Sequence, residues 1–354
     1  MTMSANFVSS QYLANALVGP VNQAQSQLAT ATTEMSTGEY ADLGLHLGDR
    51  SGYELSLKQE VAKIDALTAS NAIVSVGLST AQNALTSISD QAASTLKDLT
   101  SWNSGANTGA TLQTIGASAL QSLIASANTA SGGAYVFGGI NTSEAPMVDY
   151  FSTPDSTAKT AVLNAFQSAF GVLPSDLAAS AITASQMQTF LSGPFASLFS
   201  GSAWSSDWSS ASSVNTSAEI APGQTVTTSG NANDASFRTL AQAYTMAAAF
   251  GGSALSASAQ QAVASAASTL VSSGQGALIN LQGSLGESQS AISNANDAMS
   301  AQSTVLKTQI NTLDNIDPNA LATQITGLQT QIQMAYELTA RLQSLSLANY
   351  LPVS

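Results

Sequence analysis

The chain has 354 residues, enough for two or three domains with a sizeable core. Its formal charge is −13, from 21 acidic and 8 basic residues, so it lacks the clustered Lys and Arg by which proteins bind nucleic acid or an anionic membrane. Only 8% of residues are charged, and a surface with so few charges is poorly protected against self-association.

Cysteine is absent, which excludes disulfides, thiolate metal sites and thiol catalysis. The N-terminal segment has no Lys or Arg before Arg50 and no continuous apolar region, so we expect no cleaved secretion signal. No run of 18 apolar residues occurs, so we expect no membrane-spanning helix. Taken alone, these features indicate a cytosolic protein.

A heptad repeat near the N-terminus predicts a first long helix. Its apolar positions alternate by four and three residues, and they are Leu17, Val21, Ala24, Leu28, Ala31 and Met35. Pro20 falls inside this repeat, and we expect it to kink the helix or to mark its start.

After an irregular stretch, a second and longer repeat predicts a second helix. Its positions are Ile64, Leu67, Asn71, Val74, Leu78, Ala81, Leu85, Ile88, Ala92, Thr95 and Leu99. Several of these are small or polar, so the stripe stabilises an isolated helix poorly. The helix must therefore find a partner, either within the chain or in another copy.

The middle of the chain differs from the repeats. The run 132–139 is apolar and bounded by glycine pairs, which predicts a strand or one arm of a hairpin. Thr153-Pro154 is typical of a helix start, and that helix would end at Gly171. The run 220–226 predicts a strand, a Pro-Gly turn and a second strand, and helix returns near Asp234. We interpret 146–233 as a small separate domain, whose replacement by a short linker should leave the helical part unchanged.

The heptad repeat resumes in the C-terminal part. Its positions are Leu278, Leu281, Leu285, Ser288, Ile292, Ala295, Met299, Gln302, Leu306, Gln309, Leu313 and Ile316. Asp317-Pro318 then predicts an N-cap and the first position of a further helix. The stripe of that helix is Leu321, Ile325, Leu328, Ile332, Ala335, Leu338, Leu342, Leu345 and Asn349.

These elements predict a mainly α fold. Long antiparallel heptad helices from both chain ends form a bundle, with a small inserted α+β domain. The expected divisions are an N-terminal inner segment 1–43, bundle halves 44–145 and 234–316, the insert 146–233, and a C-terminal inner helix 317–354.

Catalytic signatures are missing from the sequence. His46 is the only histidine, and it lies between predicted helices, where a surface or packing role is the favoured interpretation. Asp314 and Asp317 lie at a helix boundary, where capping explains them better than metal binding. We therefore expect no enzyme, no catalytic or metal-binding residue and no cofactor.

Four short motifs resemble the flagellin superfamily, and most of all its hook–filament junction proteins. Ser36 and Gly38 lie in the Met-Ser-Thr-Gly that closes the first repeat, and the C-terminal region opens on a Leu-Gly-x-x-Gln of Leu285, Gly286 and Gln289. The tail 336–351 is similar to the ending of junction proteins and lacks the Pro-Gln dipeptide near which flagellins usually end. The junction signature Tyr-x-Phe-Gly-Gly…Pro is matched by Tyr135, Phe137, Gly138, Gly139 and Pro146, and the tail motif includes Arg341, Asn349, Tyr350 and Leu351.

The resemblance implies a structural subunit exported without a cleaved signal through the flagellar type III apparatus, which replaces the cytosolic interpretation. Expected partners are a hook-side junction protein, flagellin, an export chaperone and copies of the chain itself, with neither nucleic acid nor membrane. A filament-forming flagellin is the alternative, and a secreted coiled-coil effector or adhesin a remote one. The expected subunit interface on the terminal helices consists of Leu17, Val21, Leu28, Met35, Leu321, Ile325, Leu328, Ile332, Leu338, Leu342 and Leu345.

Overall fold

The computed structural model describes residues 10–105, 108–252 and 254–348, with side chains from residue 18 to residue 341 of these ranges. The chain is mainly helical, with long helices towards both ends and two small two-stranded sheets, which confirms the predicted fold class. The described part divides into two compact units, one of residues up to Lys63 and from Ala301 on, the other of residues 64–300.

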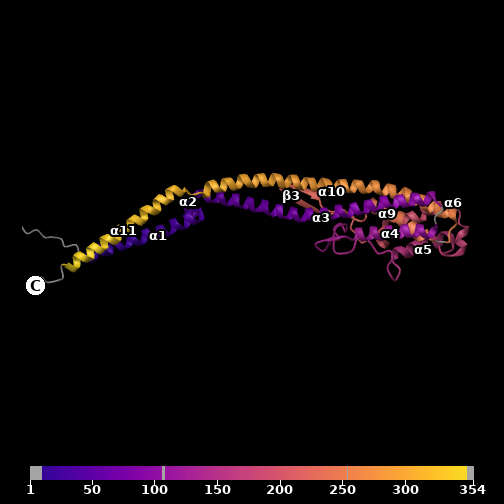
Figure 1. Cartoon of the computed structure of the whole chain (residues 1–354), viewed down its shortest axis with the longest axis horizontal. Coiled ribbons are helices and arrows are strands. Elements are labelled where there is room, and N and C mark those ends of the chain that lie inside the picture. The colour runs from indigo at the N-terminus through magenta and orange to yellow at the C-terminus, as the bar shows by residue number, and fades with distance from the viewer. Residues whose placement is uncertain (1–9, 106–107, 253, 349–354) are drawn as a thin grey trace, which may run out of the picture. The chain divides into compact units, whose positions relative to one another are not determined.

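The first unit contains the paired terminal helices. These are α1 (Ser10–Thr37) and α11 (Pro318–Ala348), which run side by side in Figure 1. Pro20 lies inside α1 and does not mark its start. Asp317 caps α11 as predicted, because its carboxylate accepts the backbone N–H groups of Asn319 and Ala320. Between α1 and α3 lie α2 (Leu43–Leu47) and a 3₁₀ turn, η1 (Gly48–Arg50).

Two long helices dominate the second unit, in which they pack antiparallel. They are α3 (Ser51–Ser104) and α10 (Ala257–Asp314), whose outer ends belong to the first unit. Every predicted stripe position from Ile64 to Leu99 is buried or half-buried, so this register is confirmed. The polar member Asn71 is fully buried, and its amide donates to the Ile220 carbonyl at 2.8 Å and to Asn296 at 2.7 Å. Because its amide is hydrogen-bonded, Asn71 can be buried in the stripe of α3 without the cost of an unpaired polar group.

The C-terminal stripe of α10 holds from Leu278 to Met299 and then shifts. Gln302 and Gln309 are exposed, and Ser303 and Ile310 face inward in their place, so these two predicted positions are wrong by one residue. Steps of three and four residues fit a helix equally well. The apolar Ile310 is the better side chain to bury, and the register follows it.

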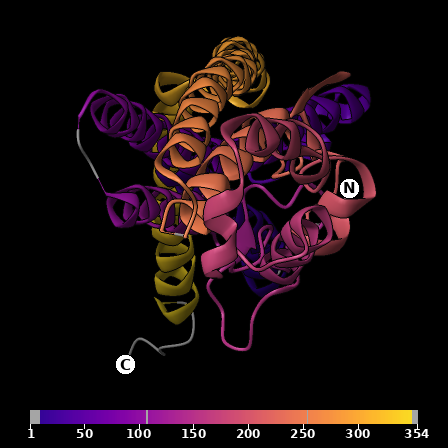
Figure 2. The same ribbon diagram turned by 90° about the vertical axis from the view of Figure 1, so that its right-hand side faces the viewer.

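Short elements gather at one end of the second unit (Figures 1 and 2). They are α4 (Gly109–Ala127), β1 (Ala130–Ser131), β2 (Ala134–Tyr135), α5 (Thr157–Phe170), η2 (Leu177–Ala181), α6 (Ala184–Ser192), α7 (Pro194–Ser197), α8 (Gly201–Asp207), β3 (Ser217–Ala221), β4 (Gln224–Thr227) and α9 (Ala235–Phe250).

Both predicted β elements are antiparallel pairs, β1 with β2 and β3 with β4. Asp234 caps α9 and Gly171 ends α5, as predicted. The start of α5 differs from the prediction, because the hydroxyl of Ser156, and not Thr153, accepts the N–H of the first turn from Lys159. Sequence reasoning missed α4 and α6 to α8.

The short elements share one hydrophobic core with the long helices. Phe250 of α9 packs against three aromatic rings of residues 146–233, with ring centroids 5.2 Å from Phe166, 5.7 Å from Phe190 and 5.5 Å from Phe195. All four rings are buried. The insert therefore completes the core of the second unit, whose described part forms one compact body.

One stretch of helix, Leu43–Ser104, includes an 18-residue window of mean hydropathy 1.3, of which 17% is buried. By length and composition this window would suffice to cross a membrane, which corrects the expectation of no such segment. Core helices of soluble proteins pass the same criterion, so the window alone indicates no membrane span. It does show that α3 carries apolar residues outside its buried stripe.

Candidate functional site: paired terminal helices and the Tyr135–Gly139 motif

The terminal helices α1 and α11 pair antiparallel within the chain. Gln25 of α1 donates to the Tyr336 hydroxyl of α11 at 2.8 Å, and Ala31 further along α1 packs with Leu321 near the start of α11. Ile316 joins Ala31 and Leu321 in a small core separate from that of the second unit. Neither helix has a charged residue in its first part, since none occurs between Ser10 and Thr33 or between Pro318 and Tyr336.

The predicted interface positions divide into three groups in the structure. Leu321 and Leu328 are buried within the chain, each 7% exposed, and Val21, Leu28, Ile325 and Ile332 are half-buried. Met35 and Leu338 are exposed. The side chains of Leu17, Leu342 and Leu345 lie outside the described residues. The stripe thus packs largely between α1 and α11, and only part of it is open to another subunit.

Further apolar side chains are exposed on the terminal helices at positions outside the predicted stripe. Val18 is 54% exposed, Met334 57% and Tyr336 55%. Each of these side chains leaves apolar area on the helix pair that a partner could cover. The heptad pattern could not find them because they fall between its positions.

The segment after α1 is held by local contacts. Gly38 ends the helix at φ +77°, a conformation that favours glycine, and its N–H donates to the Glu34 carbonyl at 2.8 Å. Ser36 donates its hydroxyl to the Thr33 carbonyl. His46 is exposed and stacks on Tyr40, with ring centroids 3.5 Å apart. The family motif at 36–38 is therefore a helix terminus, and His46 has a packing contact.

A polar cluster joins α3 to the end of α10 in the first unit. Lys58 forms ion pairs with Glu54 and, at 3.2 Å, with Asp314, and the side chains of these two acids are only 10% and 7% exposed. The hydrogen bond that Lys58 donates to Glu54 is the largest cause that raises the pKa of Lys58 above its usual 10.5, with smaller contributions from Asp314. One lysine thus neutralises two carboxylates that are largely removed from water.

Replacing Lys58 with methionine should destabilise the first unit by about 1–2 kcal/mol, because two buried carboxylates would lose their cation. This loss of stability is smaller than that expected for a fully buried ion pair, because Lys58 is 43% exposed. Since folding raises the pKa of Lys58, the stabilisation is complete below pH 10.5 and is lost as pH rises through the folded-state value. Urea unfolding at pH 7 and above pH 11 measures this, with Lys63→Met on the exposed surface of α3 as control. Equal stabilities of the two variants would contradict the proposed role of Lys58.

The Tyr135–Gly139 motif contacts both the segment that leaves the helices and the segment that returns to them. Phe137 is fully buried and lies 5.0 Å from Phe237 of α9, measured between ring centroids. The Phe137 carbonyl accepts the N–H of Ala232 at 2.9 Å. The outgoing and returning chains thus meet at this motif.

Steric constraints require glycine at both Gly138 and Gly139 of the motif. A Cβ on Gly138 would collide with the carbonyl oxygen of Asn141, and one on Gly139 would lie 2.6 Å from the carbonyl oxygen of Val214. Gly139 also has φ +62°, which strains other residues. No larger residue fits either position without movement of the backbone.

The remaining family positions are spread over the chain. Leu285 is buried in the core, Gly286 lies beside it, and the amide of Gln289 is 3.4 Å from the Ser79 hydroxyl of α3. Arg341 is exposed. Asn349, Tyr350 and Leu351 lie outside the described residues. The motif at 285–289 therefore joins α10 to α3.

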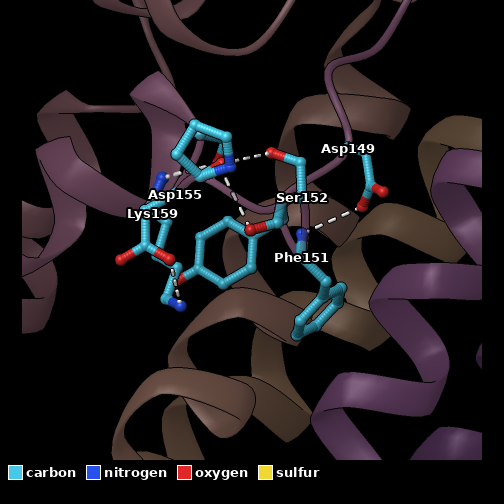
Figure 3. Close-up of polar contacts among 8 residues, drawn as sticks. Asp149, Phe151, Ser152, Asp155 and Lys159 are labelled. Atoms are coloured by element: carbon cyan, nitrogen blue, oxygen red, sulfur yellow. Dashed lines mark hydrogen bonds and ion pairs between the residues drawn. The ribbon is translucent and has the colours of Figure 1, made fainter.

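The polar cluster before α5 has the geometry of a capped turn (Figure 3). Asp149 accepts the N–H of Phe151 at 2.9 Å, Ser152 donates to the Pro154 carbonyl, and Lys159 pairs with Asp155 at 2.7 Å. Burial raises the pKa of the neighbouring Tyr150, as does the charge of Asp155. Among the residues that the structure describes, no group of three His, Asp or Glu is placed to hold a metal ion.

Comparisons with known proteins agree with this arrangement. Residues 8–142 match the bacterial flagellin N-terminal helical region, and residues 268–351 match the bacterial flagellin C-terminal helical region. Together the two matches cover more than half of the chain, and they define a structural protein of the bacterial flagellum. The chain belongs to the bacterial flagellin family.

Among solved structures, the chain is similar to a protein of Vibrio parahaemolyticus described as a flagellar hook-associated protein. The TM-score is 0.50 at 13% identity, over 75% of this chain and 97% of that chain. At this identity the likeness shows the fold alone. A comparison with curated proteins gave no match.

Proposed function

We propose that this chain is the junction subunit that links the hook to the filament. The observation that carries the proposal is the Tyr135–Gly139 motif, whose signature resembles that of junction proteins and is largely missing from flagellins. Its buried Phe137 and its two sterically required glycines show that the motif is a built element of the fold.

In this proposal the chain is exported to the cell exterior without a cleaved signal and acts as a structural subunit and not as an enzyme. Its partners are the hook-side junction protein, flagellin, an export chaperone and further copies of itself. The exposed side chains Val18, Met35, Met334, Tyr336 and Leu338 supply apolar contact area on the terminal pair. Such a pair, free of charge over most of its length, can pack against others of its kind without like-charge repulsion.

Deletion of the gene should leave hooks without filaments and release flagellin into the medium, as electron microscopy and analysis of the medium would show. Quantification of the chain in purified flagella should give roughly one ring of copies. Complementation with a chain that ends at Asp317, and so lacks α11, should not restore filaments. A count of thousands of copies per flagellum would instead identify the filament-forming flagellin.

A further inference from the structure

A groove of about 560 Å³ lies in the second unit between α3 and the β1–β2 hairpin. We call it the Ile73 groove. Its walls are mainly apolar, and hydroxyl groups form part of its lining; the residues that define it here are Ile73, Val76, Tyr135, Val136, Thr142 and Thr228. The groove thus begins at the family motif and extends along one face of α3.

The α3 wall of the groove exposes large apolar side chains to water. Ile73 is 76% exposed and Val76 61%, although Leu78 on the next turn is fully buried in the core. Helix α3 is therefore apolar on two faces, which is why a window of it has the hydropathy of a membrane span with only 17% buried. A surface helix of a monomer ordinarily has one apolar face. The second face indicates a surface that another molecule covers.

Charge favours a second copy of the chain as that molecule. No Asp, Glu, Lys or Arg occurs between Asp65 and Asp90, between Asp98 and Glu144, or between Glu219 and Asp234, the segments that supply most of the groove. Two copies that each carry −13 repel one another over most of their surfaces. They can approach closely where both surfaces are uncharged. The chain also has long helical segments without charged residues, and one of these in a second copy could occupy the groove.

A lipid surface fits the groove less well. Helices that lie on membranes combine a convex apolar face with flanking Lys and Arg, which bind the headgroups. The Ile73 groove is concave and has no base in its walls. Hydroxyl groups such as those of Thr142 and Thr228 suit a polypeptide, whose backbone can accept their hydrogen bonds.

We propose that in the flagellum the Ile73 groove is filled by an uncharged segment of a second copy of this chain. The inference rests on the proposed function, since it requires that the chain be assembled side by side with further copies. The contact joins two different surfaces, groove and segment, and such a heterologous contact can close into a ring.

The absence of cysteine allows a direct test, because a single introduced thiol is the only one in the chain. Ile73→Cys is labelled in the groove with a benzophenone maleimide, and Thr86→Cys, exposed on another face of α3, is the matched control. Illumination of purified flagella should cross-link the Ile73→Cys chain to a second copy, identified by mass and peptides. The unlabelled thiol of Ile73→Cys should react with maleimide at least about tenfold more slowly in flagella than in the free protein, as covered sites do.

Ile73→Asp provides an independent readout. Because Ile73 is exposed in the single chain, the variant should keep its unfolding midpoint, yet its incorporation into flagella should fall by at least about tenfold, the effect of burying an unpaired charge. Thr86→Asp should incorporate as the unmodified chain does. Normal incorporation of Ile73→Asp would overturn the inference.

The other possible outcomes distinguish failure of this inference from failure of the proposed function. A thiol at position 73 that reacts equally fast in flagella and in the free protein would show an open groove, and the inference would fail although the chain is a flagellar subunit. A cross-link to a different protein would contradict the second copy as occupant. If flagella contain none of the chain, the proposed function and the inference fail together.

Discussion

Replacing residues 146–233 with a short Gly-Ser linker is expected to lower the free energy of unfolding of the second unit by more than about 5 kcal/mol. Phe250 of α9 would lose its contacts with Phe166, Phe190 and Phe195. Truncation of a single buried Phe costs about 3–5 kcal/mol. The loss would approach the whole stability of an ordinary domain, about 5–15 kcal/mol.

The entropy of closing the chain with the linker contributes little to this loss of stability. Gly138 bridges Asn231, so the chain leaves and re-enters the helices at neighbouring points, and a short linker closes a small gap. The sequence interpretation, in which the insert is a separate domain, predicts no change in unfolding. The structure leads us to expect the opposite, because the insert and the helices share a core.

Urea unfolding followed by circular dichroism measures the effect, and hydrogen exchange shows whether α4 and α9 lose protection. Leu177→Ala is the control within the insert, since that side chain is 87% exposed and should change stability by less than about 0.5 kcal/mol. An unchanged unfolding midpoint in the linker variant would show that the insert folds independently.

Gly116→Ala is expected to cost about 2–3 kcal/mol, the upper part of the usual range for overpacking. Gly116 lies on α4 where α9 crosses it closely. An added Cβ would collide with the backbone nitrogen of Ala248 and lie 2.6 Å from the Cβ of Ala247. Since the first of these atoms belongs to the backbone, the two helices must separate.

Gly283→Ala in α10 is the matched control for this substitution. No atom lies within 4 Å of the Cβ that it adds, so the higher helix propensity of alanine should stabilise the protein by up to about 1 kcal/mol. Thermal unfolding of both variants compares the two effects. A Gly116→Ala variant as stable as Gly283→Ala would mean that α4 and α9 do not depend on close contact.

The long helices could be predicted because their buried faces follow a regular spacing. Along α3 every position that this spacing predicts from Ile64 to Leu99 is buried or half-buried. It fails at Gln302 and Gln309, where steps of three and four compete and the choice depends on which side chain the neighbouring helix can bury. The buried positions of α4 also follow steps of three and four residues, but Gly116 and Ala119 among them are too small to be recognised as core residues by their hydrophobicity.

The candidate site was only partly accessible to sequence reasoning. The Gly-Gly of the 135–139 motif could be noticed, but the steric constraint on Gly139 comes from the backbone near Val214, about 75 positions further along the chain. The cluster of Lys58, Glu54 and Asp314 joins residues more than 250 positions apart, and no local spacing predicts such a contact. Ile73 and Val76 lie outside the predicted stripe of α3, but only the fold shows that they line a groove with the β1–β2 hairpin.

The antiparallel pairing of α1 and α11 has a mechanical consequence. Gln25 lies opposite Tyr336 and Ala31 near Leu321, so Ser10 and Ala348 are at the same end of the pair. A force that pulls these two ends apart would open the pair one turn at a time, from Val18 towards Ala31, instead of breaking all its contacts at once. In single-molecule stretching we therefore expect the terminal pair to open at low force and to close again when the load is released, while pulling on one helix along its axis would meet far greater resistance.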